Sequence, residues 1–542
     1  MLKIINGEVY DPANGINGQL KELYVEGGKM VEQLSDPGQA QVIDAQGMVI
    51  MPGGIDIHSH IAGPKVNTGR SIRPEDHRGT EYEAKIFSRS GVGSTIPSTF
   101  TTGYLYSKLG YTTVMEAAVP PLKARHAHEE LADIPLVDKG FYTLMGNNHF
   151  VFKYIQEENH EALKNYVAWL LCATKGYGIK VVNPGGVENF KQRKDLRELD
   201  ENIEGYGITP RQVIKALVKV NEELGLPHPV HIHCNNIGHP GGYLTTLDTM
   251  KTVGDQRLHL THIQFHSYAK TKSGSIRSGA LEVADYVNQH PNITVDVGQM
   301  VFGEATTMTA DSPLEYKLHT LLHNKWVNND VELETGSGIV PLTYREKNLT
   351  HGVQWAIGLE MFLAIKNPWQ VYLSTDHPNA GPFTAYPGII KLLMDRHYRE
   401  EMLNSLHPKV KKRTSLADMT REYTLEEIAI ITRSGPAKTL GLINKGHLGQ
   451  FADADLVLYR KQEDAQLMFQ GPAFVIKDGV VVVKDQEIMA EHFGRTFYVR
   501  PFYDESVLEG IRKEFDLYST VFFDNYAVEK EYLKKCEVIP CK

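Results

Sequence analysis

The sequence has few cysteines and lacks any long apolar run. Only four of its 542 residues are cysteine, too few and too scattered for an iron–sulfur cluster or a disulfide framework: Cys172, Cys234, Cys536 and Cys541. No stretch approaches 18 uninterrupted apolar residues, and the first residues, MLKIINGEVYDP, read as strand and turn instead of a signal peptide. These absences argue against a membrane protein or a disulfide-rich secreted protein, and they predict a cytoplasmic location.

Basic stripes, glycine-rich nucleotide fingerprints and low-complexity segments are also missing. The 66 acidic residues outnumber the 57 basic ones, which gives a net charge of −9 at pH 7. Neither nucleic acid nor an anionic membrane is therefore expected as a partner. Without cysteine clusters or a dinucleotide motif, any electron transfer would have to belong to another protein. The composition favours a small-molecule substrate.

Eight short β-rich segments, with helix-like stretches between them, predict an α/β protein built on a (β/α)8 barrel. In segments such as 161–175 and 208–224, apolar side chains recur at i, i+3 and i+4, which is typical of helices packed outside the strands. The barrel is expected to span residues 51–439. Its predicted strands are residues 55–60, 111–119, 141–146, 177–182, 229–234, 258–263, 293–298 and 371–376.

The two ends of the chain share a different pattern, of short apolar runs alternating with turns. This pattern fills residues 1–50 and returns in 449–460 and 474–485. We predict that residues 1–50 and 440–495 together form a small β-sandwich that brackets the barrel. Residues 496–542 are assigned to a C-terminal tail, a candidate docking surface for other subunits.

Candidate metal ligands stand at the ends of the predicted strands, where barrel enzymes carry their catalytic side chains. His58 and His60 are two residues apart on the first strand, so both point to one face and can chelate one metal ion. Lys180 lies among apolar residues of the fourth strand. Burial would lower its pKa and let the neutral amine capture carbon dioxide, giving a carbamate that bridges two metal ions. The alternative is a lysine whose head group reaches solvent at a strand end.

Strands five, six and eight complete the set. His231 and His233 share one face of strand five, so geometry alone does not choose between them. On strand six, LHLTHIQFH offers His259, His262 and His266, of which a two-metal site needs only one.

Asp376 ends strand eight, within STDHPNAGP. As a catalytic carboxylate it would take a proton from the attacking water and deliver it to the leaving amine nitrogen. The alternative for Asp376 is a helix cap.

This order of residues resembles the amidohydrolase superfamily, in particular its hydantoinase and dihydroorotase branch. The resemblance implies two divalent metal ions, for which mixed imidazole and carboxylate ligands favour zinc, and an N6-carboxylysine at Lys180. It also implies His233, not His231, as the strand-five ligand. The matching motifs are MPGGIDIHSH at His58 and His60, GIKVV at Lys180, HCNN at His233, THIQ at His262 and TDHP at Asp376.

Longer strings, among them MPGGIDIHSHIAGPKVN, HIHCNNIGHPGG and TTMTAD, are similar to the A-subunit family of formylmethanofuran dehydrogenase, which has a relative in the bacterial formyltransferase/hydrolase complex. That resemblance implies interconversion of N-formylmethanofuran with formate and methanofuran, inside a complex with other subunits. Two alternatives stay open. One is a stand-alone cyclic-amide hydrolase of the dihydropyrimidinase type, which the six ligands alone would permit. The other is a non-catalytic scaffold of the same fold.

Overall fold

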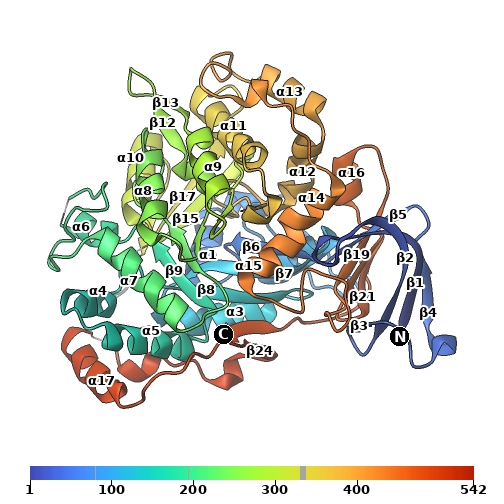
Figure 1. Cartoon of the computed structure of the whole chain (residues 1–542), viewed down its shortest axis with the longest axis horizontal. Coiled ribbons are helices and arrows are strands. Elements are labelled where there is room, and N and C mark those ends of the chain that lie inside the picture. The colour runs from blue at the N-terminus through green and yellow to red at the C-terminus, as the bar shows by residue number, and fades with distance from the viewer. Residues whose placement is uncertain (80, 193, 330–336, 520) are drawn as a thin grey trace.

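Eight parallel strands form a nearly closed barrel at the centre of the molecule (Figure 1). The computed structural model describes residues 1–79, 81–192, 194–329, 337–519 and 521–542. Each strand pairs with the next along the chain, and a bridge between Ser59 and His377 joins the first strand to the segment after the last. The predicted barrel is confirmed. Its strands are β6 (Gly54–Ser59), β7 (Tyr111–Val119), β8 (Asp138–Leu144), β9 (Gly178–Val182), β10 (Val230–His233), β11 (Leu258–Leu260), β14 (Ile293–Asp296) and β18 (Val371–Tyr372).

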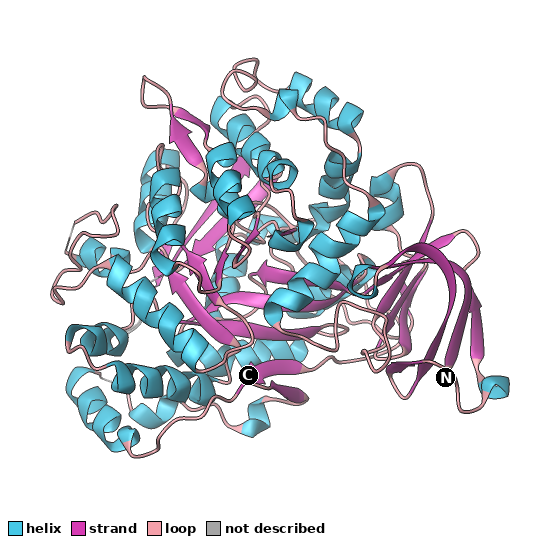
Figure 2. Cartoon of the chain, viewed as in Figure 1, coloured by secondary structure: helices cyan, strands magenta, loops and turns pink. Residues whose placement is uncertain are grey.

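Helices surround the barrel strands, which are buried along their whole length in β6 to β11 (Figure 2). Parallel strands are covered on both faces, which explains why these segments read as nearly continuous apolar runs. Helix α7 shows how the outer layer forms. Thr209 and Gln212 build a capping box at its start, and Val213 and Leu217 turn toward the core.

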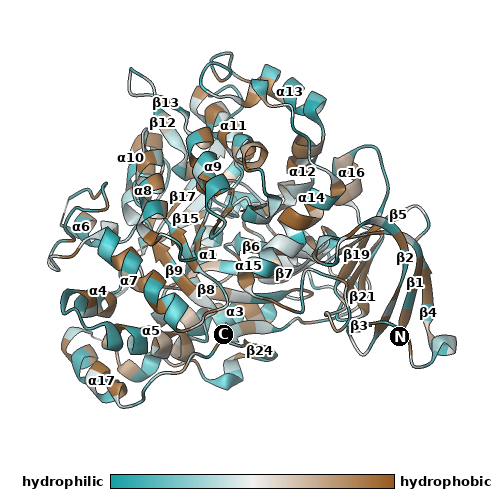
Figure 3. Ribbon diagram, viewed as in Figure 1, coloured by the Kyte–Doolittle hydropathy of each residue, from teal (hydrophilic) through white to brown (hydrophobic). Residues whose placement is uncertain are grey.

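The helices carry their apolar faces toward the strands and their polar faces outward (Figure 3). Their bounds are α1 (Pro64–Ile72), α2 (Thr99–Lys108), α3 (Ala124–Asp133), α4 (His149–Gln156), α5 (His160–Thr174), α6 (Gly186–Lys191), α7 (Pro210–Glu223), α8 (Tyr243–Val253), α9 (Ala280–Gln289), α10 (Ser312–Leu322), α11 (Leu349–Ala364), α12 (Tyr386–Met394), α13 (Arg396–Ser405), α14 (Leu425–Ala429), α15 (Gly435–Leu440), α16 (Ala465–Gln470) and α17 (Val507–Tyr518). Among the described helices, none is both long and apolar enough to cross a membrane.

The two ends of the chain meet in one mixed sheet of nine strands beside the barrel (Figure 1). Strands β5 and β19 join the halves in antiparallel register, with Val49 opposite Tyr459. Ile4, Ile50 and Ile476 belong to the apolar core of this sheet. Its strands are β1 (Leu2–Asp11), β2 (Ile16–Glu26), β3 (Lys29–Val31), β4 (Gln41–Asp44), β5 (Met48–Pro52), β19 (Leu456–Arg460), β20 (Phe474–Lys477), β21 (Val480–Lys484) and β22 (Glu487–Ile488).

The C-terminal segment is tied to the barrel wall. Strand β23 (Thr496–Val499) pairs in parallel with β8 and with β24 (Cys536–Ile539). The rings of Trp169 and Phe523 stack at 4.8 Å, which fastens the region after α17 to α5. The sequence pattern did not reveal these elements, and the docking role of this segment stays a prediction.

A separate three-stranded sheet, which the sequence pattern also did not reveal, lies over the carboxyl ends of the barrel strands. It consists of β15 (Gly303–Thr309), β16 (Val327–Asn329) and β17 (Ser337–Tyr344), with β17 in the middle. A separate hairpin pairs β12 (Tyr268–Lys270) with β13 (Ile276–Ser278). Because Thr307, Leu342 and Tyr344 line the cavity below, this sheet forms one wall of the candidate site.

Candidate metal centre

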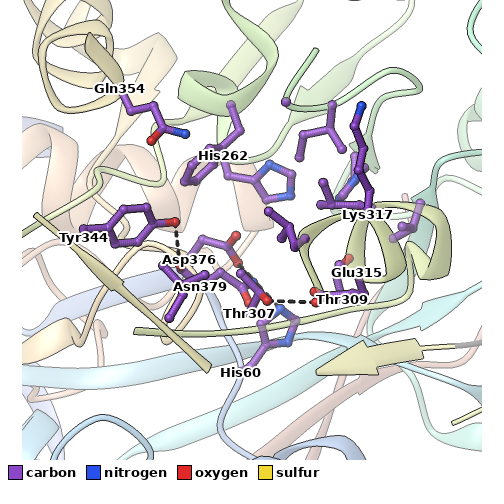
Figure 4. A pocket seen from close by; sticks show the side chains of 18 of the residues that line it. His60, His262, Thr307, Thr309, Glu315, Lys317, Tyr344, Gln354, Asp376 and Asn379 are labelled. Carbon is purple, nitrogen blue, oxygen red and sulfur yellow. Dashed lines mark hydrogen bonds and ion pairs between the residues drawn. The ribbon is translucent and has the colours of Figure 1, made fainter. Parts of the chain in front are cut away.

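All six predicted ligands line one cavity of about 280 Å³ at the carboxyl ends of the strands (Figure 4). None of them is more than 4% exposed. The strands position them, because each ligand lies within a barrel strand or in the few residues that follow one. They are His58 in β6, His60 just after it, Lys180 in β9, His233 at the end of β10, His262 shortly after β11 and Asp376 shortly after β18.

The first group of donors is His58, His60 and Asp376, whose ligand atoms lie within 4.8 Å of one another. Nε2 of His58 is 2.9 Å and Nε2 of His60 is 3.5 Å from Oδ1 of Asp376. Asp376 has a left-handed backbone with φ of 46°, and its Oδ1 accepts a hydrogen bond from Nδ2 of Asn379 at 2.8 Å. The turn after β18 therefore directs the carboxylate toward the two histidines of the first strand.

The second group is His233, His262 and His266, again with ligand atoms within 4.8 Å of one another. His262 has a φ of 35° and precedes a single 3-10 turn, Ile263–His266, which brings the ring of His266 to 5.1 Å from that of His262. Within the described part of the chain, Nδ1 of His262 and both ring nitrogens of His266 have no hydrogen-bond partner. These free nitrogens are available to a metal ion.

Lys180 lies in the same cavity as both groups. Burial lowers the pKa of its amine to about 7, against the opposing charges of Asp296 and Asp376. Its Nζ makes no hydrogen bond to any described residue. A buried amine without a partner, in a cavity lined by imidazoles and a carboxylate, fits the requirement for a bridging carbamate. The donor set fits a pair of divalent metal ions.

The structure separates the two histidines of strand five. His233 lines the cavity, and its Nε2 is 3.2 Å from Oδ2 of Asp311. His231 is not part of the lining, and its Nε2 lies 2.8 Å from Nδ1 of His58. His231 is thus placed beneath the site, where it can orient His58.

Glu116 on β7 is a site residue that the sequence analysis missed. It is fully buried, and it accepts hydrogen bonds from Nδ1 of His60 at 3.1 Å and from the amides of Ile61 and Ala62. Burial opposes ionisation of Glu116, yet these donors and Lys65 hold its pKa below the usual value. The hydrogen bond fixes the tautomer of His60 with its Nε2 free toward the cavity. A charged residue inside the apolar run YTTVMEAAV was the available signal.

Glu315 on α10 was missed as well. Burial raises the pKa of this carboxyl well above its ordinary value. Thr307 Oγ1 lies 2.8 Å from Oε2 of Glu315 and 3.0 Å from the carbonyl of Val340. A protonated Glu315 satisfies both contacts, because it can donate to Thr307 while Thr307 donates to Val340. The remaining wall of the cavity is largely apolar, with Val182, Ile237, Phe265, Leu314, Leu318 and Leu342.

Comparison with known proteins identifies the family of this chain. The model of the amidohydrolase family matches residues 41–483. The chain is 49% identical to protein FwdA of Methanocaldococcus jannaschii, over 99% of this chain and 98% of that protein. It is 38% identical to the A-subunit of the formyltransferase/hydrolase complex Fhc of Methylorubrum extorquens, over 92% and 90% of the two chains.

A solved structure gives the same result for the fold. It is the crystal structure of the formyltransferase/hydrolase complex FhcABCD from Methylorubrum extorquens in complex with methylofuran. One of its chains matches this one with a TM-score of 0.95 and 35% identity over the full length of both. The chain therefore belongs to the amidohydrolase family, in the group that contains FwdA and the A-subunit of Fhc.

Proposed function

We propose that this chain is the hydrolytic subunit of a multi-subunit complex, where it interconverts N-formylmethanofuran with formate and methanofuran. The observation that carries the proposal is the cavity in which six predicted ligands meet, in a chain similar over its full length to FwdA and to the A-subunit of Fhc. Hydrolysis and formation of the formamide pass through the same site, because the steps are reversible.

His58, His60 and Asp376 would hold one metal ion, and His233 and His262 the other, with Lys180 as N6-carboxylysine between them. Zinc fits this mixture of imidazole and carboxylate donors. When bound, two such ions lower the pKa of a water molecule toward 7 and polarise the carbonyl oxygen of an amide.

Asp376 is suited to carry the proton. In the described part of the chain, its side-chain contacts with His58, His60 and Asn379 all involve Oδ1, so none occupies Oδ2. Burial raises the pKa of the Asp376 carboxyl well above its ordinary value in the metal-free chain. Asp376 takes the proton of the attacking water and gives it to the amine nitrogen as the C–N bond breaks. Formate and the free amine are the products.

The lining of the cavity suits a substrate in which a formamide is attached to a flat, apolar group. Its apolar walls suit the furan ring of methanofuran and keep water away from the reacting carbon. Glu315, as a protonated acid, and Thr309 are polar groups in the same lining that can orient the formyl end.

The test is hydrolysis of N-formylfurfurylamine by the purified chain, loaded with zinc, without an electron acceptor. Formate release is expected, whereas dihydrouracil should be hydrolysed poorly or not at all. If Asp376 is mainly the proton carrier, Asp376→Asn should bind metal nearly normally and yet lose roughly 10² to 10⁴ in rate, the usual scale for acid–base catalysis. A requirement for a viologen dye or ferredoxin, or an unchanged rate in Asp376→Asn, would overturn the proposal. Preference for dihydrouracil would favour the cyclic-amide hydrolase instead.

A further inference from the structure

Three imidazoles form a continuous line of hydrogen bonds beneath the metal centre. Nδ1 of His228 lies 3.1 Å from the carbonyl oxygen of Thr439, and its Nε2 lies 3.0 Å from Nδ1 of His231. Nε2 of His231 lies 2.8 Å from Nδ1 of His58, whose Nε2 faces Asp376 at 2.9 Å. All three rings are at most 1% exposed. The line thus runs from a backbone carbonyl to a predicted metal ligand.

The carbonyl at the far end gives this line a direction. A carbonyl oxygen can only accept, so the hydrogen of a neutral His228 must be on Nδ1, and its Nε2 must accept. His231 then donates from Nδ1 and accepts at Nε2, and His58 donates from Nδ1. Burial lowers the pKa of His228 well below its ordinary value, so its ring is neutral. The lone pair of His58 is left on Nε2, toward the cavity.

We propose that His228 is a positioning residue that sets the tautomers of His231 and His58, so that His58 offers Nε2 to the metal. This inference rests on the metal centre of the proposed function. His228 touches neither the cavity nor any of the six ligands directly, and it acts through His231.

The carboxyl of Asp376 permits either direction, because it can accept from Nε2 of His58 when ionised and donate to it when protonated. The opposite direction is disfavoured by the contact with Thr439. It would put the hydrogen of His228 on Nε2 and leave a lone pair on Nδ1, facing the carbonyl oxygen of Thr439 at 3.1 Å. It would also place a hydrogen on Nε2 of His58, the atom needed for the metal. Thr261 Oγ1, 2.5 Å from Nδ1 of His58, does not change this outcome, because a hydroxyl can accept as well as donate.

Tyr142 holds the line in place. Its ring stacks on His228 and His231 at 4.9 Å and 4.4 Å, and its hydroxyl donates to the carbonyl of Ile57 at 2.9 Å. The ring planes of the two histidines are therefore fixed by packing, while the hydrogen bonds fix the tautomers. A substitution can therefore remove the hydrogen bonds of His228 and keep its stacking on Tyr142.

The test compares two variants of the full chain. His228→Phe keeps a ring against Tyr142 and removes both nitrogens, whereas His228→Gln keeps an amide that can donate to Thr439 and accept from His231. Zinc affinity is measured by competition with a chromogenic chelator. We expect His228→Phe to bind zinc about 10- to 100-fold more weakly, and His228→Gln to stay near the original affinity. Equal affinities in the two variants, with thermal stability retained, would contradict the proposal.

A second measurement does not depend on the stability of the His228 variants. Long-range ¹⁵N–¹H correlation spectra of the metal-free chain, with ¹⁵N-labelled histidine and His58 assigned by substitution, report its tautomer. We expect the hydrogen of His58 on Nδ1, and finding it on Nε2 would overturn the inference even if His228→Phe failed to fold. If the original chain bound no zinc, the metal centre of the proposed function would fail instead, which separates the two outcomes.

Discussion

Replacing Lys180 with methionine separates two properties of this residue. One is its expected role in metal binding, and the other is the free energy that burial of its amine costs the folded protein. The pKa of its amine falls from 10.5 to about 7 on burial. At pH 7.5 the unfolded chain keeps the amine protonated and the folded chain must release the proton. Over three pH units, at about 1.36 kcal/mol each, this destabilises the metal-free protein by about 4 kcal/mol. Because the folded pKa is the lower one, the penalty shrinks as pH rises from 7 toward 10.5.

Lys180→Met should therefore lose its metal and its activity and yet be the more stable protein without metal. With an unfolding entropy of about 2.1 cal/mol/K per residue, 4 kcal/mol corresponds to a rise in Tm of about 3.5 °C. Scanning calorimetry of the metal-stripped protein at pH 7.5 measures this rise, which should vanish only above pH 10.5. Metal analysis measures the loss of binding.

Lys139 provides the matched control. It is also buried, with a pKa of about 7, but its Nζ donates to the carbonyl oxygens of Ile134, Val137 and Gly494. Lys139→Met should keep its metal, because Lys139 is not part of the cavity lining, and it should gain less stability than Lys180→Met, since it also leaves three carbonyl groups without a donor. If Lys180→Met kept both metal ions and normal turnover, the carbamate would be wrong. In Lys180→Ala, a short carboxylic acid added with metal should restore part of the activity, because it can occupy the same bridge.

Three further predictions concern residues other than Lys180. His233→Asn should remove one metal equivalent, whereas His231→Asn should keep the stoichiometry and weaken affinity or rate about 10- to 100-fold; metal analysis giving the reverse ranking would contradict the assignment. Glu315→Gln should keep its steady-state rate within severalfold, because an amide replaces a protonated acid, and a large loss would mean that the carboxylate is ionised. Lys445 is buried among carboxylates at 2.5 to 2.8 Å, so Lys445→Met should lower the free energy of unfolding by about 3 to 5 kcal/mol in urea titrations. Because the folded pKa of one partner, Asp453, is about 2, the share of this stabilisation that Asp453 contributes should be lost as pH falls from about 4 through 2.

The barrel was predictable from the sequence because each of its strands is a local apolar run with a polar end. The segment 177–182, for example, became β9 (Gly178–Val182). The sheet over the cavity was not predictable in this way. Its strand β15 pairs with β17 across an intervening helix and strand, with Gly303 opposite Tyr344, and a short run gives no sign of a partner so far along the chain.

The six predicted ligands could be picked out from the sequence because they lie in motifs of adjacent residues, but their depth in the barrel could not. His231 and His233 share a face, and a rise of about 3.3 Å per residue places them about 6.6 Å apart along the strand. His233 therefore reaches the cavity, while His231 lies one layer deeper. Glu116 was missed because its role depends on where the segment after β6 passes, which is a property of the tertiary fold.

Distance alone suggests a third metal group beneath the cavity, formed by His58, His231 and Asp296. Its atoms are already engaged. Nδ1 of His231 bonds to His228, and the two oxygens of Asp296 accept from the amide of His262 and from Nε2 of His259. A metal ion in this position would have to displace a set of buried hydrogen bonds.

The side chains that line the cavity form the upper layer of the barrel, and their hydrogen bonding differs from that of this deeper group. Nδ1 of His262, both nitrogens of His266 and Nζ of Lys180 have no hydrogen-bond partner among the described residues. Buried polar groups without partners are unfavourable, so metal binding in the upper layer relieves an existing penalty, whereas binding in the lower layer would create a new one. The arrangement of satisfied and unsatisfied nitrogens therefore favours the cavity as the site of the proposed metal ions, with the deeper histidines placed to orient the predicted ligands above them.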